Sequence, residues 1–294
     1  MTSDRLFILG LGDSALRLAR RARARGFAVA GTVRGGDKAR ALRAEGIEAV
    51  PLVEGGADAA RAALSGATHI LGSIPPDDSG DPGLTLLADD VARAAPRWLG
   101  YLGTTGVYGD RGGGWVDEDA PVAPSSERAR RRVVAEAQWT ALGRRVGRAP
   151  DIFRLPGIYG PGRSALDQVR AGTARRVDKP GQMFSRIHVD DIGTAVLAAI
   201  DRGGDGRIYN VADDEPAPQA DVVAFACALL GVEPPPLVPY AEIEASLSPM
   251  ARSFYAESRR VRNDRLRREL GVALAYPTYR EGLRAIHAAE TAEH

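Results

Sequence analysis

Residues 6–19 read LFILGLGDSALRLA, and this stretch decides the fold. Four apolar residues lead into a turn with Gly10 and Gly12, and a segment typical of a helix follows, with the small Ala15 in its first turn. This order is the G-x-G-x-x-A variant of the dinucleotide turn, which joins the first strand of a βαβ unit to its first helix. The alternative is a turn with only a structural role. We expect a pyrophosphate to be bound by Gly10, Gly12, Asp13, Ser14 and Ala15.

The alternation of short apolar runs with helical patterns continues beyond this turn, which predicts βαβ units and a parallel sheet. Strands are expected over 6–10, 27–33, 47–52, 68–74, 98–104, 152–157 and 207–212. Helices are expected from the turn to about residue 25 and over 37–46, 58–64, 84–95 and 191–200. The predicted fold is therefore α/β, with a Rossmann-type doubly wound parallel sheet.

The character of the chain changes after Asp213, where prolines interrupt helical, arginine-rich stretches. This change predicts a smaller, mostly helical C-terminal lobe beside the sheet, to which the segment between the last two long strands also contributes. We expect residues 1–158 with 186–213 to form the nucleotide-binding domain. Residues 159–185 with 214–294 are expected to form the lobe that binds substrate.

Composition narrows the class of partner. The 294 residues carry a formal net charge of +1, which gives no overall field for nucleic acid or an anionic membrane. No apolar run reaches the roughly 18 residues that a membrane span needs. Cys227 is the single cysteine, and no Cys/His cluster has the spacing of a metal site. We expect a cytoplasmic protein without a metal, whose partner is a small molecule and neither nucleic acid nor a membrane.

The end of the second predicted strand bears on the choice of cofactor. An NAD-selective site places a carboxylate there for the ribose 2′-hydroxyl, but this strand ends in Val33 followed by Arg34. The planar guanidinium of Arg34 suits a 2′-phosphate, and Lys38 can assist it. The alternative is that Arg34 is a solvated loop residue. NADP(H) is therefore the expected cofactor, with NAD(H) as the second option.

Four further stretches carry a resemblance to a known family. They read YLGTTGVYGD (101–110), FRLPGIYGPGR (153–163), FSRIHVDDIGTAV (184–196) and IYNVADDEP (208–216). Together they resemble the extended short-chain dehydrogenases/reductases of the NAD(P)-dependent epimerase/dehydratase group, from residue 6 to about 283. The resemblance implies a nicotinamide near TTGVYG and a substrate between the domain and the lobe.

The same resemblance implies roles for particular residues. Thr104 or Thr105 would be the hydroxyl that hydrogen-bonds the substrate, and register with the family pattern favours Thr104. The alternative is that both are ordinary strand-end residues. Further cofactor contacts are expected from the loop after the fourth strand and the end of the sixth, namely Ser73, Ile74, Pro75, Leu155 and Pro156.

The segment with His188, Asp190 and Asp191 invites an acid–base or metal interpretation. In the family it mainly ties the lobe to the core and caps the next helix. An Asp before an apolar-periodic run is a typical N-cap, so we expect a structural role here.

The family pattern fails in the stretch SERARRRVVAE (126–136). Related proteins carry Tyr-x-x-x-Lys on this helix, where the Lys holds the ribose and the Tyr exchanges a proton. Register on Glu136 places Arg128 and Arg132 at those two positions. Arg132 can still bind a ribose or phosphate, but a guanidinium does not release its proton. An Arg132–Glu136 pair one turn apart is expected on the helix.

Replacement proton donors are expected at Tyr108 and Tyr159, although a packing role for either is the alternative. The leading hypothesis is an NADP(H)-dependent oxidoreductase that acts on a small carbonyl, imine or activated alkene without the usual Tyr/Lys pair. Loss of that pair also supports a second hypothesis, a catalytically silent NADP(H)-binding sensor or scaffold. A sugar-nucleotide epimerase or dehydratase is less favoured, because those reactions rely on the missing Tyr. The resemblance is compatible with a homodimer.

Overall fold

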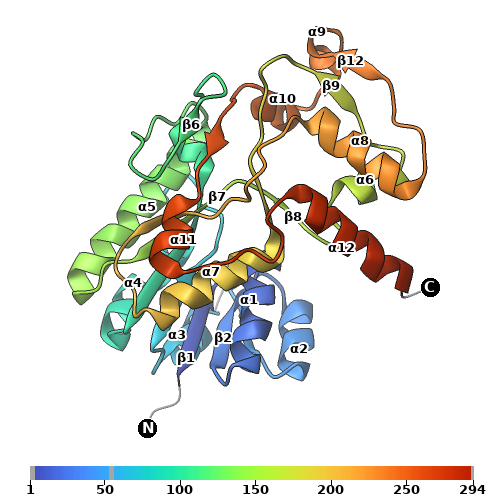
Figure 1. The fold of residues 1–294 in the computed structure, drawn as a ribbon. Coiled ribbons are helices and arrows are strands. Elements are labelled where there is room, and N and C mark those ends of the chain that lie inside the picture. The colour runs from blue at the N-terminus through green and yellow to red at the C-terminus, as the bar shows by residue number, and fades with distance from the viewer. Residues whose placement is uncertain (1–3, 53–55, 293–294) are drawn as a thin grey trace.

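The protein is described here by a computed structural model that covers residues 4–52 and 56–292. Its centre is a seven-stranded sheet with the order β11-β7-β5-β4-β1-β2-β3, in which every neighbouring pair is parallel (Figure 1). The strands are β1 (Arg5–Leu9), β2 (Ala28–Val33), β3 (Glu48–Pro51), β4 (His69–Gly72), β5 (Trp98–Thr104), β7 (Asp151–Leu155) and β11 (Ile208–Asn210). The chain therefore has the Rossmann-like α/β fold that the sequence predicts.

Helices cover both faces of this sheet. One face carries α1 (Asp13–Ala24), α2 (Gly36–Ala44) and α7 (Val189–Asp201), and the other carries α3 (Ala57–Leu64), α4 (Pro82–Ala94) and α5 (Glu127–Val146). Strand β1 shows why both layers form, because its successive side chains point to opposite faces. Leu6 and Ile8 belong to the core under α1, whereas Phe7 and Leu9 belong to the core under α4.

The smaller lobe lies beyond the carboxyl ends of the sheet strands (Figure 1). Its elements are β9 (Arg176–Asp178) paired with β12 (Leu237–Pro239), and the helices α6 (Ala165–Arg170), α8 (Gln219–Leu230), α9 (Tyr240–Ile243), η2 (Glu244–Ser246), α10 (Pro249–Tyr255) and α12 (Tyr279–Ala292). A separate apolar cluster that includes Tyr159, Leu166, Val222 and Leu283 holds the lobe together.

Short elements connect the two parts. They are η1 (Thr105–Tyr108), β6 (Trp115–Val116) paired with β13 (Arg260–Val261), and β8 (Gly157–Tyr159) paired with β10 (Arg186–His188). The sequence does not predict these pairs, because strands of two or three residues have no periodicity of their own and form only when distant segments meet.

One C-terminal helix does not belong with the lobe. Helix α11 (Asp264–Leu270) returns to the sheet, where Leu266 and Leu270 join the core that contains α1 and α7. The division into a nucleotide-binding domain and a lobe stays a prediction, but the packing removes 264–270 from the lobe. The chain therefore crosses between the two parts several times.

Two searches of the described residues, 4–52 and 56–292, bear on the class of protein. None of the helices there combines the length and the apolar character that crossing a membrane requires. Within the same ranges, His, Cys, Asp and Glu side chains form no group of three or more that could hold a metal ion.

Candidate functional site

The residues expected to bind the cofactor follow the carboxyl ends of neighbouring strands. Gly10 follows β1, Arg34 follows β2, Ser73 follows β4, Thr104 ends β5, and Leu155 ends β7. Because these strands are parallel, their carboxyl ends lie at one edge of the sheet, where doubly wound folds bind ligands. The sheet thus brings together segments that are up to 145 residues apart in the chain.

The glycine turn has the geometry of an anion site. Gly10 has φ +93°, and a Cβ there would lie 2.7 Å from Ile74 Cγ1, so only glycine fits. Gly12 is the N-cap of α1, no side chain caps this end, and a Cβ at Gly12 would meet nothing within 4 Å. The N–H groups of Asp13, Ser14 and Ala15 in the first helical turn therefore remain for a ligand, which fits a pyrophosphate.

The loop after β2 lacks a carboxylate aimed at a ribose. Val33 is buried, and Arg34 and Lys38 are exposed. Arg34 forms no ion pair with any residue of the described ranges, whereas the nearby Asp37 pairs with Arg40. A guanidinium without a partner at this position fits a 2′-phosphate.

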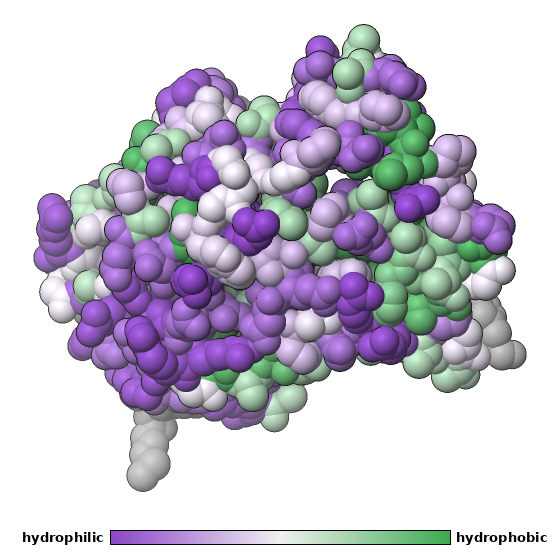
Figure 2. All heavy atoms as spheres, turned by 45° about the horizontal axis from the view of Figure 1, so that its top comes forward, coloured by the Kyte–Doolittle hydropathy of each residue, from purple (hydrophilic) through white to green (hydrophobic). Residues whose placement is uncertain are grey.

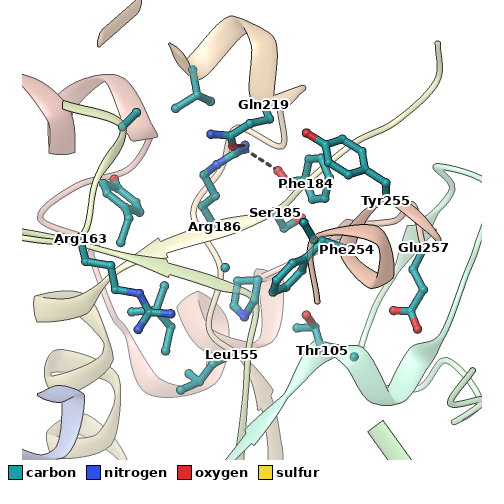
Figure 3. A pocket seen from close by; sticks show the side chains of 18 of the residues that line it. Thr105, Leu155, Arg163, Phe184, Ser185, Arg186, Gln219, Phe254, Tyr255 and Glu257 are labelled. Carbon is teal, nitrogen blue, oxygen red and sulfur yellow. Dashed lines mark hydrogen bonds between the residues drawn. The ribbon is translucent and has the colours of Figure 1, made fainter. Parts of the chain in front are cut away.

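A cavity of about 900 Å³ lies next to the ends of β5 and β7 and extends under the lobe. Figure 2 shows the corresponding hollow between the sheet domain and the lobe on a mostly hydrophilic face. The floor of the cavity includes Thr104, Thr105, Leu155 and Pro156, and its roof includes residues of α10. Figure 3 shows labelled side chains from both parts converging on this space.

The two threonines differ in what their hydroxyls do. Thr104 Oγ1 accepts a hydrogen bond of 3.1 Å from the N–H of Gly106 and so caps η1. The Thr105 side chain points into the cavity (Figure 3), and its hydroxyl makes no hydrogen bond to the described residues. Register favours Thr104 as the substrate contact, but this geometry favours Thr105.

Helix α5 places both replacement arginines at the cavity. Arg128 is exposed there and Arg132 is half-buried. Arg132 Nη1 donates to Leu102 O at 2.9 Å and to Tyr101 Oη at 3.2 Å, which orients its guanidinium toward the end of β5. Arg132 thus remains positioned for the cofactor contact that we expect of it.

The predicted Arg132–Glu136 pair is wrong. Glu136 instead accepts two hydrogen bonds from Arg154 of β7, at 3.2 and 2.8 Å, inside the protein. A carboxylate on a buried helix face pairs with the nearest buried cation, and that cation comes from the sheet. This pair holds α5 against β7 and thereby sets the position of Arg128 and Arg132 at the cavity.

The two proposed replacement acids do not present their hydroxyls to the cavity. Tyr108 is fully buried, does not line the cavity, and donates to Asn210 Oδ1 at 2.8 Å. Tyr159 does line the cavity, but its hydroxyl donates to Thr278 O at 3.3 Å and lies against Gly282 of α12. Burial raises the pKa of both phenols. These contacts favour the packing alternative for each tyrosine over a role as proton donor.

The segment around His188 is structural, as expected. Asp191 accepts the N–H groups of Ala275 and Tyr276, at 2.8 and 3.0 Å, which ties the C-terminal chain to α7. The expected Asp N-cap is wrong: His188 is the N-cap, and its Nδ1 accepts from Asp190 N at 3.3 Å. Burial lowers the pKa of His188 to about 4, so this imidazole is neutral at neutral pH and serves as an acceptor.

Two cavity residues have no motif that singles them out in the sequence. Arg186 is the first residue of β10 and is only 7% exposed. Tyr255 ends α10, and burial raises the pKa of its phenol. Arg186 does lie in the stretch FSRIHVDDIGTAV (184–196), but nothing in that pattern indicates that its side chain is buried at a cavity.

The cavity is strongly cationic for a nearly neutral chain. Six of its lining residues in the described ranges are arginines, and two are carboxylates. One of these, Glu257, already pairs with Arg259 at 2.6 Å, and the other, Asp167, accepts from Ser164. The remaining arginines are Arg128, Arg132, Arg163, Arg175 and Arg186, and none has a carboxylate within 4.0 Å among the described residues.

Comparisons with known proteins identify the proteins that this chain resembles. The family model described as "NAD dependent epimerase/dehydratase family" matches residues 83–212. A Streptomyces protein named 3-diazoavenalumate denitrifying reductase is 32% identical over 180 residues, which are 57% of this chain and 58% of that protein. Protein YeeZ of Escherichia coli K12 is 31% identical over 244 residues, which are 78% of this chain and 84% of that protein.

Solved structures extend the likeness to the whole chain. A Silicibacter pomeroyi protein described as functionally unknown is 45% identical, with a TM-score of 0.86 over 98% of this chain and 99% of that chain. Human epimerase family protein SDR39U1, solved with NADPH, is 17% identical, with a TM-score of 0.74 over 97% and 99%. The dTDP-glucose 4,6-dehydratase of Bacillus anthracis, solved with NAD, is 15% identical, with a TM-score of 0.78 over 99% and 97%. The last two show the fold.

Proposed function

The chain belongs to the NAD-dependent epimerase/dehydratase family, and on this premise we propose that it is an NADP(H)-dependent reductase of a small, electron-poor double bond. The observation that carries the proposal is the cavity at the ends of β5 and β7, where Thr105 keeps a free hydroxyl and arginines occupy both positions of the usual Tyr/Lys pair. The substrate would be a carbonyl, an imine or an activated alkene.

The residues present fit a nicotinamide dinucleotide. The first turn of α1 would hold the pyrophosphate, Arg34 with Lys38 the 2′-phosphate, and Leu155 with Pro156 would border the nicotinamide. When bound, this cofactor supplies a hydride. Structures of relatives with NADPH or NAD support a cofactor of this class, and the free Arg34 supports NADP(H) in particular.

The arginines define which reactions suit the cavity. A guanidinium donates hydrogen bonds but keeps its proton, so Arg128 and Arg132 can stabilise a negative charge that develops on the substrate without neutralising it. Such a site suits a substrate in which the negative charge formed by hydride addition is delocalised, as in an activated alkene, and the proton is then taken from water. It also suits a substrate whose reduction by hydride requires no added proton. The relative named as a denitrifying reductase of a diazo compound supports this class.

Binding and turnover can be measured on the same purified protein. NADPH and NADH are titrated, and NADPH oxidation is then followed against a panel of carbonyls, imines, unsaturated acids and ketones. We expect NADPH to bind more tightly than NADH and at least one panel member to be reduced. Tight NADPH binding without any turnover would instead indicate a silent NADP(H)-binding protein, and absence of NADPH binding would contradict both.

The 2′-phosphate contact has its own variant. Arg34→Glu replaces the free guanidinium with a repelling carboxylate, so NADPH affinity is expected to fall at least tenfold, or about 1.4 kcal/mol. NADH affinity should change little, which makes NADH the internal control. Equal losses for the two nucleotides would place Arg34 outside the 2′-phosphate site.

A further inference from the structure

The cavity contains a buried cation that the proposed hydride transfer does not use. Arg186 comes from β10, lines the cavity and is 7% exposed. Its Nη1 donates to Phe184 O at 2.8 Å and to Ala217 O at 3.0 Å, and its Nη2 donates to Gln219 Oε1 at 2.9 Å. Figure 3 shows the guanidinium beside Gln219 and Phe184, on a different side of the cavity from Thr105. All three acceptors are neutral, so they orient the charge without compensating it.

No carboxylate in the described part of the chain lies within 4.0 Å of this guanidinium. Asp213 lies beside the backbone of Arg186, since its N–H donates to Arg186 O at 2.7 Å. However, one oxygen of Asp213 accepts from Glu215 N and the other is buried without a partner. Burial raises the pKa of Asp213 well above its usual range, which disfavours the charged form of this carboxyl. A guanidinium does not lose its proton, so the charge on Arg186 remains.

The unused donors of Arg186 have a defined shape. Three of its five N–H groups are taken, so Nε–H and one Nη2–H have no partner among the described residues. Nε and Nη2 lie on the same edge of the guanidinium, and a fork of donors on one edge matches the two oxygens of a carboxylate in a bidentate pair. The surrounding lining is aromatic and apolar, with Phe184, Phe254 and Leu155 among its members.

We propose that Arg186 binds a carboxylate of the substrate, so that the protein acts on a small carboxylic acid with an aromatic or apolar body. The inference rests on the proposed function for the reacting end, which Thr105 and the nicotinamide would face. A monoanion matches the single enclosed charge of Arg186, whereas a phosphate monoester would bring more negative charge than this fork compensates. The exposed Arg128, Arg163 and Arg175 would attract such an anion to the cavity.

The test compares two ligands with the same styryl body and different head groups, and a third in which a phenyl ring carries a phosphate. Cinnamate, cinnamamide and phenyl phosphate are titrated calorimetrically into the protein and its variants saturated with NADP⁺, which has no hydride to transfer to them. We expect cinnamate to bind at least about tenfold more tightly than cinnamamide, and Arg186→Gln to remove that difference. Arg186→Lys keeps the charge but not the fork, so it should restore only part of the difference. Arg280→Gln, which removes a cation of the same lobe outside the cavity, should leave it intact.

The outcomes separate this inference from the proposed function. The NADPH affinity of each variant reports whether its dinucleotide site still folds. A wild-type protein that does not bind NADPH would contradict the proposed function. If NADPH binds normally but cinnamate and cinnamamide bind equally, or neither binds at millimolar concentration, the carboxylate inference is overturned and the proposed function stands. If phenyl phosphate binds more tightly than cinnamate and this binding depends on Arg186, the group that Arg186 binds is a phosphate and the carboxylate inference is wrong.

Discussion

Thr104 and Thr105 are neighbours in the chain but serve different purposes. The hydroxyl of Thr104 is used as the N-cap of η1, whereas the hydroxyl of Thr105 faces the cavity. Thr105→Val is expected to lower kcat/KM for the reduced substrate at least about tenfold, because a hydrogen bond to a developing charge contributes about 1.5–3 kcal/mol. The measurement is steady-state NADPH oxidation.

The matched control is Thr104→Val. It should reduce the free energy of unfolding by about 1 kcal/mol through loss of the cap, while turnover stays near the wild-type value. Reversed effects of the two substitutions would return the substrate contact to Thr104, as register with the family pattern favours.

The raised pKa of Asp213 makes the free energy of unfolding depend on pH. Since its pKa is raised in the folded state, the folded protein holds this proton more tightly than the unfolded chain does. Its stabilising contribution is complete below the unfolded pKa of about 3.9 and is lost as the pH rises above that value toward the folded pKa. Asp213→Asn removes this titration and keeps an acceptor for Glu215 N. The variant should therefore be more stable than the wild type at about pH 8, with a gap that narrows toward about pH 4.

Urea unfolding at several pH values measures this gap. A wild type that is the more stable protein at about pH 8 would mean that Asp213 is ionised and compensates Arg186, which would also weaken the case for a carboxylate in the substrate.

At the scale of elements, a buried ion pair holds α5 against the sheet. Glu136 of α5 and Arg154 of β7 form a pair whose side chains are 9% and 4% exposed. Glu136→Gln leaves Arg154 buried without a countercharge, so we expect the free energy of unfolding to fall by about 3–5 kcal/mol. Chemical denaturation measures this loss.

The first turn of the same helix offers a control. Glu127 pairs with Arg130 at 3.0 Å on the surface, and Glu127→Gln should change stability by no more than about 1 kcal/mol. Similar losses for the two variants would show that the buried pair contributes no more than an exposed one.

The whole molecule is tied together by chain that crosses between its two parts. Helix α11 packs in the core of the sheet domain although lobe elements precede and follow it, and Asp191 binds the backbone just before α12. We therefore expect both parts to unfold in one transition. Trp98 and Trp139 lie in the sheet domain, and Trp115 lies in the connecting strand β6. Far-UV circular dichroism also reports the helices of the lobe.

Coincident midpoints of tryptophan fluorescence and circular dichroism are the expected result in urea. A second transition seen only by circular dichroism would show that the lobe unfolds separately. The homodimer suggested by the family resemblance stays a prediction, and sedimentation at two protein concentrations tests it.

The sheet, its helices and the edge at which we expect the cofactor could be predicted from the sequence. These features depend on local patterns: apolar runs of four to seven residues, helical periodicity, and a glycine turn whose backbone conformation excludes other residues. The position of Gly10 and the exchange of Tyr and Lys for Arg128 and Arg132 can be identified without coordinates, because each is set by spacing along one chain segment.

The partners of buried polar groups could not be predicted, because they depend on the tertiary packing. Glu136 pairs with Arg154, Tyr108 donates to Asn210 and Tyr159 to Thr278, and Arg186 has no carboxylate partner among the described residues. The physical reason is that a buried polar side chain binds whichever complementary group lies within about 3 Å, and in a parallel sheet with crossing connections that group comes from a remote segment.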